Sequence, residues 1–351
     1  MKPRLSALFT VAGLMAAPVC AQPTSQPPTA QGPGAQEYEA PRTSWGVPDL
    51  QGYWTNTSLT GMERPERASG VTVSQREADL LARQHGLTAA GVQESSLSAL
   101  DEAASRRLLA DRNTSRGYNR FWMDPGASYA QVKGEYRTAW VVDPAGGMIP
   151  YREAQWPRLQ NVDGPEVRPQ SERCLMSFTR SAGPVLSNGL YNNTYQIVQT
   201  PDAVMILTEM IHDARIIPIG KTHGPAAIPK WGGDSVGWYE GDTLVVETVN
   251  PHPGQRSYIS ATGKLTERFS RWSDGQVLYR FTVEDPALYS RTWSGEMALN
   301  VSAQPPYEYA CHEGNYALPA ILAGARQMER DGRPGQAIKP YIGSIDVSEG
   351  Q

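Results

Sequence analysis

The sequence predicts a mainly β protein: an antiparallel meander forming a lipocalin-like barrel or curved sheet, with N-terminal helices and a C-terminal helix packed outside. Among 351 residues there are 33 Gly and 28 Pro, and only 19% are charged, a composition typical of a loop-rich soluble domain. From about residue 136 onward, apolar residues alternate with a period of two, which indicates strands. These strands follow one another through short turns without crossover helices, and this order favours antiparallel pairing.

The first residues have the pattern of an export signal. Lys2 and Arg4 precede an apolar stretch at 8–17, and small residues lead to an expected cleavage site after Ala21. The apolar stretch is too short to span a bilayer. We therefore expect a periplasmic or secreted protein with no membrane span.

The mature chain begins with a segment that lacks core-forming residues. Residues 22–40 are rich in Pro and Gln and are predicted to be a disordered linker, and residues 41–345 a single β-rich domain. Ser74 and Glu77 form a capping-box pattern that predicts a helix ending before Gly86. Residues 98–112 carry apolar side chains at helical spacing and predict a second helix.

The β region is predicted to consist of strand pairs joined by turns: 137–143 with 148–151, 194–200 with 203–211, 236–239 with 243–249, and 265–272 with 277–283. One further strand is expected at 291–301. Residues 319–330 predict a closing helix.

Removal of the signal takes Cys20 away and leaves Cys174 and Cys311. In an oxidising compartment these two residues are a candidate disulfide. The alternative is a reactive thiol at Cys311, favoured by the neighbouring His312. The structural bridge is the preferred interpretation because exported proteins seldom keep thiols free.

The chain lacks the strong signatures of several enzyme classes: it has no Gly-rich phosphate loop, HExxH, GxSxG or paired CxxC motif. We therefore expect no nucleotide cofactor; no residue is assigned as a metal ligand, and whether a metal binds is left open. A formal net charge of −4 gives no basic footprint for nucleic acid. A small-molecule ligand or substrate is the expected partner, and the oligomeric state is left open.

The first candidate site is the run Glu209 to Arg215, which follows an apolar strand. In this run Asp213 could orient His212 as a general base, while Glu209 supplies a carboxyl group and Arg215 a positive charge. The alternative is an Asp213–Arg215 ion pair at the strand end, with His212 a satisfied core residue.

The second candidate site surrounds Cys311. A disulfide there would fix a rigid corner from which His312, Glu313 and Asn315 project. The alternative is a strand-to-helix turn in which Asn315 caps the terminal helix. Two histidines, His212 and His312, are too weak a signal for a metal site.

The third candidate site is the hairpin around the turn 274–275. A regular two-residue turn places Arg268 and Tyr279 on the inward face and Glu267 on the solvent face. An inward Arg268 would bind a carboxylate or, in the alternative, pair with Glu247 on the neighbouring strand.

Aromatic and amide side chains form the fourth candidate set. Tyr195, Asn193 and Trp231 would contact a sugar or an aromatic ligand. They are also ordinary residues of strands and loops. A Pro/Gly-containing loop at 221–231 is a candidate lid bearing His223.

Four stretches, at 45–54, 209–215, 233–247 and 309–316, resemble a large family of uncharacterised exported bacterial proteins. The similarity covers nearly the whole mature chain. It implies a bacterial, exported protein folded as one continuous unit, and it implies no activity.

The leading hypothesis is a cofactor-independent lyase, isomerase or hydrolase acting on a small organic molecule in the barrel. Here His212 with Asp213 moves a proton, Glu209 or Glu313 is the complementary acid, and Arg215 or Arg268 stabilises negative charge. The rival hypothesis is a non-catalytic lipocalin-like periplasmic binding protein. The enzyme hypothesis requires the stretches 209–215 and 309–316 to face one hollow, whereas solvent-facing His212, Asp213 and Glu313 would favour the binding protein.

Overall fold

A computed structural model describes residues 38–86, 124–152, 171, 173–176, 183–253 and 257–333. The described residues from Glu39 onward belong to one compact unit. The predicted signal peptide, the linker as far as residue 37, the helix at 98–112 and the domain's last residues, 334–345, lie outside the described residues.

The described elements are two α-helices, thirteen strands and a short 3-10 turn, η4. Their bounds are β1 Gly52–Thr55, β2 Thr72–Val73, α1 Gln75–Gln84, β3 Gln131–Val132, β4 Glu135–Arg137, β5 Val141–Asp143, β6 Thr194–Gln199, β7 Ala203–Thr208, η4 Met210–His212, β8 Asp213–Pro218, β9 Asp234–Glu240, β10 Thr243–Val249, β11 Lys264–Ser273, β12 Gln276–Glu284, β13 Trp293–Val301 and α4 Ala317–Arg330. The predicted mainly β class is confirmed.

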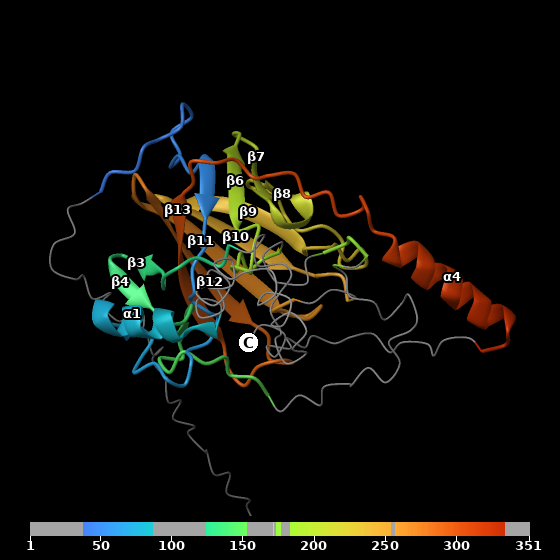
Figure 1. Ribbon diagram of the computed structural model, residues 1–351. Coiled ribbons are helices and arrows are strands. Elements are labelled where there is room, and N and C mark those ends of the chain that lie inside the picture. The colour runs from blue at the N-terminus through green and yellow to red at the C-terminus, as the bar shows by residue number, and fades with distance from the viewer. Residues whose placement is uncertain are drawn as a thin grey trace, which may run out of the picture. The chain divides into compact units, whose positions relative to one another are not determined.

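Nine strands form one antiparallel sheet that is nearly closed into a barrel (Figure 1). Their order is β8-β7-β6-β1-β13-β12-β11-β10-β9, so the first strand lies between β6 and β13. The two end strands approach each other where Ile219, just after β8, bridges to Gly237 of β9 in parallel, and the Gly220 amide donates to the Gly237 carbonyl at 2.8 Å. The strand β5 adds to β13 outside this path, and β2, β4 and β3 form a separate small sheet.

The barrel strands bury one face, as their sequence alternation predicts. In β6 and β7 every second residue is buried, and β11 alternates in the same way as far as Phe269. Large aromatic side chains fill the main core, among them Trp54, Trp140, Trp293, Tyr258, Tyr289, Phe269 and Phe281. Burial of this apolar area is the main term that stabilises the fold.

Both described helices match predicted ones. Ser74 caps α1 by accepting the Glu77 amide at 3.3 Å, whereas the Glu77 carboxylate bonds to Ser69 instead of completing the capping box. Three apolar residues of α1 pack in a second small core beneath the small sheet. Helix α4 lies outside the sheet (Figure 1), and none of its residues is buried.

The hairpin predicted at 137–143 and 148–151 is wrong. Residues 141–143 pair with β13, and β4 pairs with β2 and β3. The segment between β4 and β5 lies beside residues 61–62, where the Trp140 amide donates a hydrogen bond to the Gly61 carbonyl at 2.9 Å. Long-range partners thus replace the local turn that the sequence suggested.

The predicted strand 203–211 ends earlier, at Thr208. Ile211 and His212 adopt left-handed φ angles of 64° and 54°, which turn the chain back on itself. The following residues form β8 and pair with β7, with Ile206 opposite Arg215. Strand β8 was not predicted, because the polar residues at its start resemble those of a functional loop.

The turn at 274–275 is as predicted, with Ser273 opposite Gln276. A β-bulge then places Trp272 as an extra residue, so Arg271 lies opposite Val277 and Phe269 opposite Tyr279. One extra residue moves every preceding side chain of the strand to the other face. The predicted register before the bulge is therefore wrong.

Candidate binding site inside the barrel

Three polar side chains meet in the barrel interior: Arg215 of β8, Glu267 of β11 and Tyr279 of β12. The Nη1 atom of Arg215 lies 2.9 Å from Oε2 of Glu267, and the Tyr279 hydroxyl donates to Oε1 of Glu267 at 2.8 Å. Glu267 and Tyr279 have no solvent exposure, and the Arg215 side chain is 13% exposed. This cluster is the most buried group of charges among the described residues.

The strand registers explain how these residues come together. Glu267 lies between the buried Leu265 and Phe269 on β11, and it is opposite Phe281 on β12. The bulge at Trp272 directs this face inward. The prediction that Glu267 faces solvent was wrong because a regular strand without a bulge was assumed.

The cluster has hydrogen-bonding capacity that the described part of the chain does not use. The ion pair is close, yet its N–H is not aligned with the carboxylate, and Nε, Nη1 and Nη2 of Arg215 and Oε2 of Glu267 are buried without a hydrogen-bond partner there. Buried polar atoms left without partners are costly and are uncommon in native proteins. These atoms keep the capacity to bond an ordered water or a polar ligand.

A second buried polar pair, Asn56 and Tyr195, adjoins the cluster through Leu186. The Leu186 amide donates to the Tyr279 hydroxyl at 3.2 Å, and its carbonyl accepts Nδ2 of Asn56 at 2.7 Å. Nδ2 of Asn56 also lies 3.3 Å from the Tyr195 hydroxyl, while the Oδ1 of Asn56 is buried and has no partner among the described residues. Tyr195, a predicted binding residue, thus belongs to the barrel interior.

Burial keeps the interior phenols neutral. It raises the pKa of the Tyr195 hydroxyl. The hydrogen bond with Asn56 lowers this pKa, and the charge of Glu209 raises it further. Burial, and to a smaller extent the negative charge of Glu267, raise the pKa of Tyr279 well above 10. The positive charge of Arg215 lowers this pKa but does not cancel the rise. Both hydroxyls therefore act as hydrogen-bonding groups rather than as proton sources near neutral pH.

The predicted dyad of His212 and Asp213 is not formed. His212 is exposed, and its imidazole makes no hydrogen bond or ion pair with Asp213 or with any other described residue. Glu209 is buried and serves the backbone turn, since it accepts Nδ2 of Asn192 at 2.9 Å and the Thr194 amide at 3.2 Å. Of the first candidate run, Arg215 reaches the barrel interior, and Asp213, two residues earlier on β8, is partly buried on the same face of the strand.

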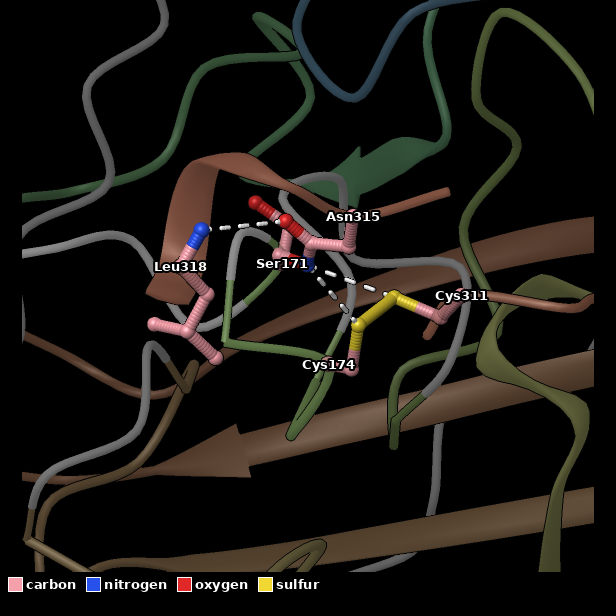
Figure 2. The surroundings of a disulfide bond; sticks show 5 residues. All are labelled: Ser171, Cys174, Cys311, Asn315 and Leu318. Carbon is pink, nitrogen blue, oxygen red and sulfur yellow. Dashed lines mark hydrogen bonds between the residues drawn. A yellow bond between two sulfur atoms is a disulfide. The ribbon is translucent and has the colours of Figure 1, made fainter. Parts of the chain in front are cut away.

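A disulfide joins Cys174 to Cys311, as the cysteine count predicted (Figure 2). Nδ2 of Asn315 lies 3.7 Å from the Cys174 sulfur, and its Oδ1 accepts the Leu318 amide at 3.3 Å in the first turn of α4. His312 and Glu313 are exposed. The corner is a strand-to-helix connection supported by Asn315, which is the alternative interpretation of the second candidate site.

The two predicted stretches approach the same loop without bringing their catalytic groups into contact. Asn192 bonds to Glu209, and burial together with the nearby Tyr309 raises the pKa of Tyr191 to about 12. Among the described residues, no hydrogen bond or ion pair joins the His212 side chain to the 309–316 corner, and no group of three His, Cys, Asp or Glu is suited to a metal ion.

Three other predicted binding residues lie away from the cluster. Arg268 points outward, 43% exposed, with Nη1 2.7 Å from Oε2 of Glu240, so the inward assignment was wrong. Trp231 is partly exposed and stacks on His252 with ring centroids 4.1 Å apart. Asn193 is buried and bonds to the backbone of Gly189 and Asp124, a structural role. Tyr279, by contrast, points inward as predicted.

The structure also shows a cluster that the sequence analysis did not assemble. His223, in the predicted lid, lies between two carboxylates, with Nδ1 3.1 Å from Asp234 and Nε2 3.2 Å from Glu247. Asp234 also accepts the Gly224 amide at 2.7 Å and pairs with Lys230. Because both imidazole nitrogens are engaged by carboxylates, the cluster holds the loop on β9 and β10.

No protein-family model matches the chain, and no curated protein is detectably similar to it. Among the described residues, no helix is both long and apolar enough to cross a membrane.

Proposed function

We propose that this protein is an exported bacterial binding protein of the lipocalin-like type, which holds a small organic molecule inside the barrel. The observation that carries the proposal is the set of buried polar atoms on Arg215 and Glu267 that have no hydrogen-bond partner among the described residues. Small β-barrels commonly hold one small ligand among their inward side chains.

The binding role is preferred over acid–base catalysis for a geometric reason. In the catalytic hypothesis Asp213 orients His212, and this role requires a hydrogen bond between the two side chains. His212 and Glu313 are exposed, and His212 lacks a bond to Asp213. The remaining polar cluster, around Arg215, is suited to holding a ligand and offers no imidazole.

Export and membership of the resembling bacterial family are part of the same proposal. Lys2, Arg4 and the apolar stretch at 8–17 support export, and the Cys174–Cys311 disulfide is compatible with an oxidising compartment. Expression in a bacterial host followed by mass spectrometry of the periplasmic fraction tests this part. We expect a chain that begins at Gln22, and a chain retained in the cytoplasm with Met1 would contradict it.

The binding role is tested with an uncharged apolar dye, N-phenyl-1-naphthylamine, and with extraction of small molecules from the natively purified protein. We expect saturable dye binding at one site per chain, with energy transfer from the buried Trp54 and Trp293. The variant Arg268→Met is the matched surface control and should bind the dye as the unaltered protein does. Absence of both saturable dye binding and a co-purifying small molecule would overturn the proposal.

A further inference from the structure

We propose that the barrel selects an uncharged ligand that carries a carbonyl oxygen beside an N–H group, such as an amide, lactam or imide, in preference to a carboxylate. The inference rests on the proposed function and concerns the chemistry of the ligand at Arg215 and Glu267.

The positive charge of Arg215 is already matched, by Glu267 and by the nearby carboxyl group of Asp213. Arg215 and Glu267 carry opposite charges 2.9 Å apart, and the Glu267 carboxylate has no solvent exposure. A ligand carboxylate on Arg215 would place a second negative charge beside Glu267 without water to screen it. An uncharged ligand avoids this repulsion.

The unused hydrogen-bonding atoms have a definite pattern. The Tyr279 hydroxyl donates a hydrogen bond to Glu267 and accepts one from the Leu186 amide. Its one donor is therefore used, and so is one of its acceptor positions. What is left is a set of donors on Arg215 and two acceptors, Oε2 of Glu267 and Oδ1 of Asn56. A carboxylate has no donor for these acceptors, whereas an amide offers an acceptor and donors together.

The surroundings indicate an apolar remainder for the ligand. Phe269 and Phe281 lie with ring centroids 4.8 Å and 5.8 Å from that of Tyr279. Val246 lies directly opposite Glu267 on β10 and is fully buried. An aromatic or alicyclic amide combines the polar and apolar features that these side chains complement.

The test uses three probes of nearly equal size, namely benzamide, benzoate and toluene, with the unaltered protein at pH 7. Binding is measured by displacement of N-phenyl-1-naphthylamine and by ligand-observed NMR. We expect benzamide to bind at least tenfold more tightly than benzoate and than toluene. This comparison needs no variant and so does not depend on the folding of one.

Two variants assign the selectivity to the cluster. In Glu267→Gln, where Arg215 loses its ion-pair partner and keeps only the charge interaction with Asp213, benzoate should gain at least tenfold relative to benzamide. In the double variant Arg215→Met/Glu267→Leu, which removes both charges together, benzamide should lose its advantage over toluene. Circular dichroism establishes that each variant is folded, and the double variant serves where Glu267→Gln does not fold.

Benzoate binding as tightly as benzamide, or more tightly, would overturn the inference while dye displacement upheld the proposed function. Benzamide binding that the folded double variant leaves unchanged would also overturn it, because the probe would then bind elsewhere. Absence of saturable binding by the dye and by all three probes would overturn both.

Discussion

Arg215 and Glu267 form an ion pair inside the barrel, with Nη1 2.9 Å from Oε2 and the carboxylate closed off from solvent. Two charges taken out of water stabilise a fold only when each keeps its partner. Several consequences for stability and binding follow from this pair and from the other buried charges.

Replacement of one residue of the buried Arg215–Glu267 pair should destabilise the fold far more than replacement of one residue of an exposed ion pair. We expect Glu267→Ala to lower the free energy of unfolding by about 3–5 kcal/mol, because the buried Arg215 loses its ion-pair partner and keeps only the charge interaction with Asp213. The neighbouring Arg268→Ala breaks only the exposed pair with Glu240 and should cost about 1 kcal/mol or less. Urea unfolding followed by tryptophan fluorescence measures both. Equal losses would show that Glu267 is not buried as a charge.

The carboxylate of Glu296 should make the stability of the fold sensitive to low pH. Burial raises its pKa, but Arg280, Lys133 and Arg137 outweigh this and hold the pKa below the ordinary value. Because the folded-state pKa is depressed, the stabilisation is complete above the unfolded pKa of about 4.3 and is lost as pH falls through the folded pKa.

We therefore expect Glu296→Gln to reduce the free energy of unfolding at pH 7 and to flatten its decline below about pH 4. Glu135→Gln, at an exposed partner of Arg137, is the control and should change stability by about 0.5 kcal/mol or less. Denaturation curves collected at a series of pH values give both slopes. A variant whose acid slope matches that of the unaltered protein would remove Glu296 from this account.

Asp213 should behave in the opposite sense. Burial raises its pKa despite the Ala214 amide and the Arg215 charge, so folding disfavours its ionised form. This penalty is absent at pH values below the unfolded pKa of about 3.9 and is complete above the folded pKa. Asp213→Asn should raise the melting temperature at pH 7 and lose this advantage as the pH is lowered through the same range. A lower melting temperature at pH 7 would mean that attraction to Arg215 outweighs burial.

The loop at 221–231 is expected to depend on Asp234 more than on His223. Burial raises the pKa of Asp234, yet Lys230, the Gly224 amide and His223 together hold it below the ordinary value. His223→Ala removes one of these interactions and should cost about 1.5 kcal/mol of local stability, whereas Asp234→Ala removes all three and should cost more.

Hydrogen exchange of the Gly224 amide is the direct measurement, because this amide donates to Asp234 at 2.7 Å. Exchange should quicken in both variants, and most in Asp234→Ala. Asp242→Asn, at an exposed partner of Arg42, should leave the exchange rate unchanged. Unchanged Gly224 exchange in Asp234→Ala would show that other contacts hold the loop.

Gly295 on β13 has no room for a side chain. A Cβ atom there would lie 2.9 Å from the Trp140 carbonyl oxygen and would collide with the Phe281 ring. We expect Gly295→Ala to cost about 3 kcal/mol or more, since neither group can move without disturbing the core. Gly275→Ala, with the Val301 side chain 3.9 Å away, is the matched control. Similar melting temperatures for the two variants would contradict this packing.

The sequence by itself determined the features that depend on near neighbours. Alternation with a period of two specified strands such as β6 and β12, the turn at 274–275 set the pairing of Ser273 with Gln276, and Ser74 fixed the start of α1. The cysteine count was also sufficient to suggest the disulfide, because only two cysteines follow the expected cleavage site.

Tertiary structure decided which of these residues share a site. The bulge at Trp272 exchanged the roles of Glu267 and Arg268, and the left-handed turn at His212 moved its imidazole to solvent while β8 carried Arg215 inward. Bulges and strand partners are set by packing across the whole barrel, whose energies no local window of sequence contains. The polar cluster is therefore a product of the closed sheet, even though each of its residues is visible in the sequence.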